Sequence, residues 1–184
     1  MKFLKDIKEK IGYSSLNKII EESDRNKSIR GLNSTKSVGI VFSAADQETY
    51  DKAKKLAAWF TEKKIKVSAL GYVEEKEVLS YYSYYVGFDF YCKKNLNWLR
   101  KPTGHIIENF IENPIDILID LSLVDEFPIL YVVAHSQASF KVGRLSERTN
   151  YYDLMIDIEQ DNTIDFLIDQ VKNYLTMINS NNQI

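Results

Sequence analysis

Short apolar runs alternate along the chain with segments in which apolar residues recur every three or four positions. The run "SVGIVFSA" (37–44) is apolar and partly β-branched, as a strand buried on both faces should be. Ser43 or Asp46 can cap a helix directly after it. That helix is indicated by apolar residues at helical spacing: Ala53, Leu56, Ala57 and Phe60. The pattern therefore predicts a strand followed by a helix.

The same alternation continues to the end of the chain. Further strands are predicted at 65–73, 86–92, 115–122, 139–143 and 151–158, and helices at 74–82, 103–114 and from the capping residue Asn162 to Ile178. Strands that alternate with helices form a mostly parallel sheet with both faces covered. We therefore predict an α/β fold, a doubly wound, mostly parallel, Rossmann-like three-layer sandwich with an N-terminal helical extension.

The stretch "FPILYVVAHSQASFKVG" (127–143) can be read in two ways. A strand at 129–133 follows the local β propensity, but only about six residues would then separate it from the strand at 115–122, too few for a parallel crossover. A helix from about Asp125 to Gln137 gives a clean β-α-β unit, with Asp125 as N-cap and Pro128 in the first turn. We favour the helix, which places His135 on a helix face.

The connection to the sixth predicted strand is a polar loop, "RLSERTN" (144–150). It is too short for a helical crossover. We therefore expect the strand at 151–158 either to run antiparallel to the fifth strand or not to neighbour it.

The N-terminal residues form a basic arm. Residues 2–28 read as two amphipathic helices broken near Gly12, and 31–36 read as a linker, so the expected division is an arm at 1–34 and an α/β domain at 35–184. Residues 1–36 carry nine Lys or Arg against five Asp or Glu, a net +4 in a chain of net −2, which leaves −6 for the rest. The arm is either a docking element for RNA, an acidic protein or a membrane surface, or a helix packed on the domain.

Composition excludes several classes of protein. The net charge of −2 argues against the broad basic surface of a DNA-binding protein. A single cysteine, Cys92, and two histidines leave no disulfide framework and no basis for a metal site. Lysines interrupt the apolar N-terminus, and no window approaches the length of a membrane span, so we expect a cytoplasmic protein that is not an integral membrane protein.

Ligands of open α/β sheets bind at the carboxyl ends of the strands. The turn "FSAADQ" after the first strand lacks the glycines of dinucleotide-binding and phosphate-binding loops, so we expect no nucleotide cofactor in its usual mode. Ser43 and the helix that follows could hold one anion, or Ser43 could only cap the helix. Ser122 and Arg144 follow the fourth and fifth strands and are further candidate binding residues.

The loop "KKNLNWLRKP" after the third strand interleaves cations with an aromatic residue. The candidate binding residues in it are Lys93, Lys94, Trp98, Arg100 and Lys101. Such a pattern suits a phosphate, an RNA backbone with a stacked base, or an acidic protein surface. The alternative is a solvated loop that Trp98 anchors by being buried.

Asp120 ends the predicted fourth strand and is the only catalytic candidate. It could act as a general base, a metal ligand or a cap for the next turn. No G-x-S-x-G elbow accompanies it, and His135 is expected on the wrong face to assist. The tyrosine cluster "YYSYY" (81–85) suits either ligand stacking or, more simply, the edge of the core.

Several of these motifs together resemble an uncharacterised bacterial family of domains of unknown function. They are "VGIVFSA", "NLNWLRKP", "IDILIDLS", "FPILYVVAHSQASFKVG" and "YYDLMI", and the likeness covers roughly residues 37–178. The resemblance implies common ancestry and no known activity. Residues 119–121, 136–138 and 142–143 also resemble, locally, the first half of heptosyltransferase-type glycosyltransferases. Those enzymes need a second Rossmann half, for which this chain is too short.

Two hypotheses follow. The first is a non-catalytic binding or assembly module that docks onto a protein or ribonucleoprotein through its N-terminal helices and the 93–101 loop. The second is a small-molecule or nucleotide-binding enzyme that uses Ser43, Lys94, Trp98, Asp120 and Arg144 at the strand ends. A deep pocket bounded by those side chains favours the enzyme, and an Asp120 that only caps the backbone favours the module.

Overall fold

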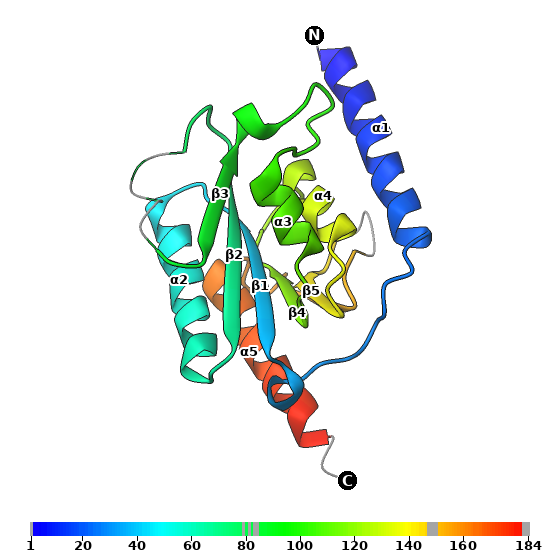
Figure 1. Ribbon diagram of the computed structural model, residues 1–184. Helices are drawn as coiled ribbons and strands as arrows, with labels where there is room; N and C mark the ends of the chain where they lie inside the picture. The colour runs from blue at the N-terminus through cyan, green and yellow to red at the C-terminus, as the bar shows by residue number, and fades with distance from the viewer. Residues whose placement is uncertain (1, 79, 81, 83–84, 147–150, 182–184) are drawn as a thin grey trace.

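A computed structural model describes the backbone of residues 2–78, 80, 82, 85–146 and 151–181, and the side chains of residues 12–78, 80, 82, 85–146 and 151–178. Its centre is one sheet of six parallel strands in the order β3-β2-β1-β4-β5-β6 (Figure 1). The strands are β1 (Ser37–Ser43), β2 (Lys66–Val73), β3 (Phe88–Cys92), β4 (Ile117–Asp120), β5 (Phe140–Arg144) and β6 (Leu154–Ile156). This order confirms the doubly wound Rossmann-like fold, with its switch point between β1 and β4.

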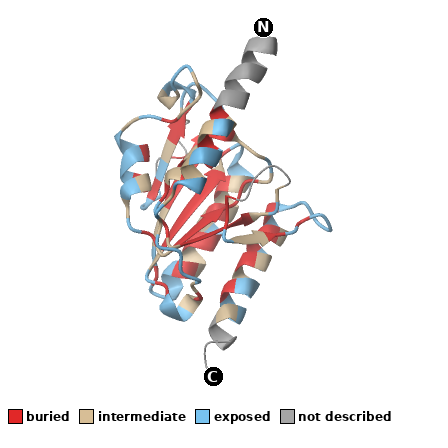
Figure 2. Cartoon of the chain, turned by 90° about the vertical axis from the view of Figure 1, so that its right-hand side faces the viewer, coloured by how far each residue is buried: buried red, intermediate tan, exposed pale blue. Residues whose placement is uncertain are grey.

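Helices cover both faces of the sheet. On one face lie α2 (Gln47–Glu62) and α5 (Ile164–Asn181), and on the other lie α3 (His105–Glu112) and α4 (Phe127–His135). The strand residues between the two layers are buried, whereas the outer helix faces are exposed (Figure 2). In β1, for example, Ile40 and Phe42 pack toward α2 and α5, and Val41 packs toward α3 and α4. The strands are mostly apolar because both faces are buried.

The orientation expected for the sixth strand is wrong. β6 pairs parallel to β5, with Val142 opposite Leu154 and Arg144 opposite Ile156. In the described part of the connection, Tyr152 lies directly over Gly143, where even a Cβ atom would come within 2.6 Å of the tyrosine ring. The tyrosine side chain thus covers β5 at this position.

The helix predicted in the stretch at 127–143 is confirmed as α4, but its cap is not Asp125. Glu126 occupies the N-cap position, with no hydrogen bond from its side chain to the first turn, and Pro128 lies in that turn. Asp125 instead binds Arg144 and accepts a hydrogen bond from the Ser146 hydroxyl at 2.9 Å. The Asp125 carboxylate pairs with a cation, which forms a stronger hydrogen bond than a backbone N–H, and therefore does not cap the helix.

The N-terminal arm contains one helix, α1 (Lys2–Glu21), where two were predicted. Gly12 does not break it. The ring of Phe127 packs directly against this glycine, so that a Cβ atom added at position 12 would lie 2.7 Å from the ring. Leu16 is fully buried in the same contact with α4. The described half of α1 is therefore a helix packed on the domain. Residues 23–30 are not helical.

Three smaller expectations are also corrected. Residues 74–77 form bends and no α-helix, and Leu79 and Tyr81 of that predicted helix lie outside the described residues. Residues 32–34 of the predicted linker form a short 3-10 helix, η1 (Leu32–Ser34). Thr163, and not Asn162, caps α5 through a hydrogen bond from Phe166 N to its Oγ1 at 3.3 Å.

Within the described part of the chain, no helix has the length and apolarity needed to cross a membrane.

Candidate functional site

Asp120 lies at the switch point and uses both carboxylate oxygens inside the fold. Its Oδ1 accepts a hydrogen bond from Ser122 N at 2.8 Å, and its Oδ2 accepts one from the Tyr152 hydroxyl at 2.7 Å. Burial raises the pKa of the Asp120 carboxyl, and these hydrogen bonds oppose the shift. With 2% of its surface exposed, Asp120 serves as the cap of the turn after β4.

Of the polar residues around Asp120, Ser122 is buried, and Ser43 and Glu126 are partly buried. Ser43 does not cap α2, because Asp46 does so through Thr49 N at 2.7 Å. Ser43 instead hydrogen-bonds the carboxyl of Glu126, whose pKa is raised by burial. The Ser122 hydroxyl lies close enough to Asp120 to stabilise its charge, but it makes no well-aligned hydrogen bond with any described residue.

Sequence reasoning missed two residues of this region. The sequence patterns singled out neither Glu126 nor Tyr91. The Tyr91 hydroxyl is buried with no hydrogen-bond partner among the described residues. Its position in the middle of an apolar strand was the available signal, because a buried tyrosine hydroxyl usually finds a partner.

The residues at 93–102, named here the Trp98 loop, project from the end of β3 in a closely hydrogen-bonded conformation. Asn97 Oδ1 accepts from Leu99 N at 2.9 Å and from Lys101 N at 3.1 Å, and Asn97 N donates to Lys101 O at 3.0 Å. Asn95 Oδ1 ties the start of the loop to Cys92 N at 2.9 Å. Arg100 has a φ of 63°, a left-handed conformation that few residues other than glycine adopt. The loop thus has a defined shape.

Most cations of the Trp98 loop are paired with glutamates that follow β2. Lys93 Nζ and Arg100 Nη2 each lie 3.3 Å from the Glu74 carboxylate, and Lys94 Nζ lies 2.5 Å from Glu77. Burial raises the pKa of Glu74, but the hydrogen bond from the Tyr72 hydroxyl and the charge of Arg100 outweigh it, so the pKa is lowered overall. These pairs reduce the positive charge that the loop presents.

Trp98 itself is not the buried anchor of the loop. Its side chain is 72% exposed, the highest value among the large apolar side chains at the carboxyl ends of the described strands. Val124 after β4 and Leu145 after β5 are also exposed at this edge of the sheet, at 61% and 46%. An exposed tryptophan on an ordered loop is unusual, because tryptophan is ordinarily well buried.

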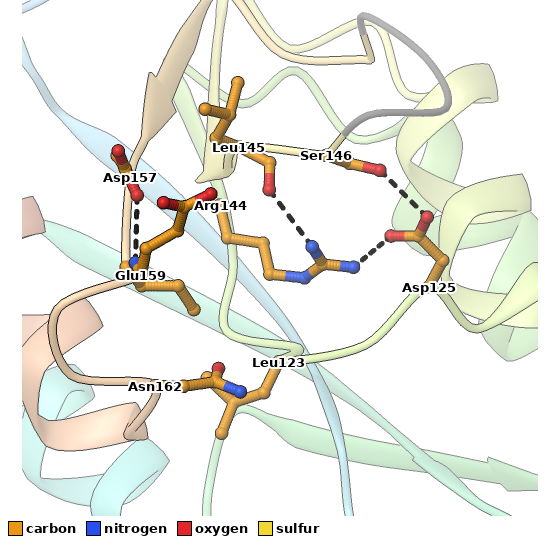
Figure 3. A pocket seen from close by; sticks show the side chains of 9 residues that line it. Leu123, Asp125, Arg144, Leu145, Ser146, Asp157, Glu159 and Asn162 are labelled. Atoms are coloured by element: carbon orange, nitrogen blue, oxygen red, sulfur yellow. Dashed lines mark hydrogen bonds and ion pairs between the residues drawn. The ribbon is translucent and has the colours of Figure 1, made fainter.

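Arg144 lines a separate pocket of about 510 Å³ at the ends of β4, β5 and β6 (Figure 3). Its guanidinium binds the Asp125 carboxylate and the Leu145 carbonyl, the latter at 3.0 Å. Asp157 and Glu159 also line the pocket, so acids outnumber the one cation. The other candidates, Ser43, Lys94, Trp98 and Asp120, do not line it, so this pocket does not bring the strand-end residues together. The described side chains contain no cluster of three potential metal ligands.

The family comparison agrees with the resemblance to a family of domains of unknown function. No curated protein matches the chain, and no named relative supports the local likeness to heptosyltransferase-type enzymes. A model described as a family of unknown function, DUF6913, matches residues 8–178. This match takes in α1 from its second turn, the whole sheet and nearly all of α5, and the chain therefore belongs to the DUF6913 family.

Proposed function

We propose that this domain is a non-catalytic binding module that recognises a protein partner through the Trp98 loop. The observation that carries the proposal is Trp98, a large aromatic side chain held 72% exposed on an ordered loop. Tryptophan dominates the binding energy of many protein interfaces because it buries a large area and loses little conformational freedom.

The hydrogen bonds within the loop support this role. Asn95 and Asn97 each accept hydrogen bonds from the loop backbone, so the conformation that presents Trp98 exists before any partner binds. An ordered loop avoids much of the entropy loss that a mobile loop suffers on association. The left-handed conformation of Arg100 fits the same view, because uncommon backbone conformations gather at binding sites.

The charge pattern favours a protein over a ribonucleoprotein. Binding to an RNA backbone draws on several cations that neutralise phosphates. In the Trp98 loop, three of the four cations already face glutamates: Lys93, Lys94 and Arg100. An aromatic centre with balanced charges around it resembles the core and rim of a protein interface.

The geometry of Asp120 supports the module over the rival enzyme. Both of its oxygens accept hydrogen bonds from the fold, and neither Asp120 nor Trp98 lines the pocket that contains Arg144. The described half of α1 packs its apolar face, with Leu16 buried, against α4, so the proposal places the contact on the loop and not on the arm.

The proposal is tested by introducing a photo-crosslinking amino acid at position 98 of the full chain in its native cell. We expect one protein to be captured in near-stoichiometric yield, and Trp98→Ala in an affinity purification to lose the same protein. The matched control places the crosslinker at Val86, which is 98% exposed. Val86 precedes β3, whereas the Trp98 loop follows it. Equal capture from both positions, or capture only of nuclease-sensitive RNA from position 98, would contradict a protein partner at this loop.

A further inference from the structure

Lys141 is a buried amine in the middle of β5. The residue is 3% exposed, and its Nζ donates hydrogen bonds to the carbonyl oxygens of Val133, at 2.6 Å, and Ala134, at 3.4 Å. Both carbonyls belong to the last turn of α4, where the helix leaves acceptors without partners. Among the described residues, these two carbonyls are the only hydrogen-bond partners of the amine. A neutral amine can satisfy both with its two N–H groups and still keep its lone pair.

A small pocket lies against Lys141 beneath the segment that follows α1. Its volume is about 90 Å³, and Ile20, Ser23, Lys27 and Tyr151 are among the residues that line it. This volume is well above the roughly 10–15 Å³ that one water molecule needs, and far below the several hundred Å³ of a pocket for a sugar or nucleotide. The space admits only a very small molecule next to the amine.

The charges around the pocket are mostly positive. Arg25 and Lys27 approach from the segment after α1, and Asp153 approaches from the residue before β6. The Arg25 guanidinium forms a two-bond pair with Asp153 at 2.6 and 2.7 Å and also donates to Ala138 O at 2.8 Å. Arg25 and Asp153 therefore neutralise each other, which leaves Lys27 as the unbalanced charge beside the amine.

This environment favours the neutral amine. Burial, followed by the nearby charge of Arg25, lowers the pKa of Lys141 to about 7; Lys27 adds to this shift, and Asp153 opposes it. On α4, burial lowers the pKa of His135, and the charges of Lys101 and Lys141 add to that shift. A large fraction of Lys141 is thus unprotonated near neutral pH, whereas an ordinary lysine is almost wholly protonated there.

We propose that Lys141 is a carbon dioxide-binding residue that forms a carbamate in the pocket beneath the Arg25–Lys27 segment. The Nζ lone pair forms a bond to the carbon of carbon dioxide, and one C=O π pair moves onto oxygen. The nitrogen then loses one proton to solvent, so that Nζ–H₂ and carbon dioxide become Nζ–H–COO⁻ and a proton. No oxidant or other reactant is required.

Size and charge together favour carbon dioxide over other electrophiles. With a neutral amine, Arg25, Lys27 and Asp153 sum to +1, and the carbamate brings this sum to zero. A protonated imine with a small aldehyde would instead place a second positive charge beside Lys27, and a larger carbonyl compound would exceed the pocket.

The test uses the wild-type, full-length protein equilibrated with carbon-13-labelled bicarbonate and dissolved carbon dioxide near neutral pH. We expect a carbamate resonance in the carbon-13 spectrum that falls as pH is lowered below the pKa of Lys141. Alkylation with a trialkyloxonium salt converts a carbamate into a stable ester, and peptide mass spectrometry should locate that ester on Lys141. Absence of the resonance, or an ester spread evenly over surface lysines, would overturn the proposal.

Three variants sharpen the assignment. Lys141→Arg replaces the neutral amine with a permanent cation that is not a nucleophile, and should abolish the resonance. Lys66→Arg, at an exposed strand lysine, should leave the resonance unchanged. Lys27→Ala should lower the carbamate fraction by about two- to fivefold, the effect of one exposed ion pair. A resonance that survives in Lys141→Arg would overturn the proposal.

Discussion

Two cation-rich parts of this molecule use the same residue types under opposite conditions. In the Trp98 loop, Lys93, Lys94 and Arg100 reach solvent and face glutamates whose side chains are at least half exposed. In the cluster of Arg25, Lys27, Lys141 and Asp153, named here the Lys141 cluster, the Arg25 side chain is 5% exposed and Lys141 is 3% exposed.

The difference shows that burial, and not the count of charges, decides what a cation does. An exposed ion pair contributes at most about 1 kcal/mol and is screened by salt, so the loop's cations are free to be re-paired by a partner. A buried cation must be fully hydrogen-bonded, and removal of one partner leaves an uncompensated charge. The loop therefore suits recognition, whereas the Lys141 cluster suits stability and reactivity.

The largest expected effect comes from breaking the buried pair. Arg25→Ala leaves the Asp153 carboxylate without its cation and frees the segment after α1 from Ala138 O and Ser139 O. We expect a loss of roughly 3–5 kcal/mol in the free energy of unfolding, measured by urea titration. The matched change in the loop, Lys93→Ala, should cost less than about 1 kcal/mol. Equal losses would remove the distinction between the two regions.

The next effect is the pH dependence of stability that Lys141 confers. Its pKa is about 7 in the folded protein and about 10.4 when unfolded, so between these values the unfolded chain binds a proton that the folded chain does not. Stability should therefore rise with pH across this window, by up to ~1.4 kcal/mol per pH unit.

Lys141→Met should remove this rise, as measured by urea titrations from pH 7 to 10 in buffer free of carbon dioxide. Lys66→Met, at an exposed strand position, serves as the control and should keep the rise. A wild-type protein whose stability is flat across the window would show that Lys141 is charged in the fold.

The fold was largely predictable because each strand has an apolar run of its own. The stretch at 127–143 needed one long-range argument, the length of a parallel crossover, and that argument placed α4 correctly. The orientation of β6 was missed because its parallel pairing with β5 is a contact between separate segments. No local sequence pattern specifies such a pairing.

The two cationic regions differed in how visible they were. The Trp98 loop stood out because its cations are close together in the sequence. The sequence does not show that they pair with Glu74 and Glu77. In the Lys141 cluster, Arg25 and Lys27 lie more than a hundred residues before Lys141 and Asp153, and the two pairs meet only in the fold. One signal was present, since Lys141 interrupts a strand predicted to be buried, and a buried lysine needs partners.

The smallest expected effect tests the exposed side of the comparison. Glu74 faces Lys93 and Arg100 and accepts a hydrogen bond from the Tyr72 hydroxyl. Glu74→Gln preserves the shape and an acceptor for Tyr72 but removes the charge, so we expect a loss of about 0.5–1 kcal/mol at neutral pH. Because the folded pKa of Glu74 is lowered, this contribution is present above the unfolded pKa and is lost as pH falls through the folded value.

Urea titrations of the wild type and Glu74→Gln should therefore converge at acid pH, and also at high salt, where exposed charges are screened. A difference that persisted under both conditions would mean that Glu74 acts through packing and not through charge. Glu74→Gln also raises the net charge beside Trp98 by one, so a protein partner with an acidic rim should be captured in higher yield. An unchanged yield would show that Trp98 supplies the binding energy and that the charged residues around it contribute little to it.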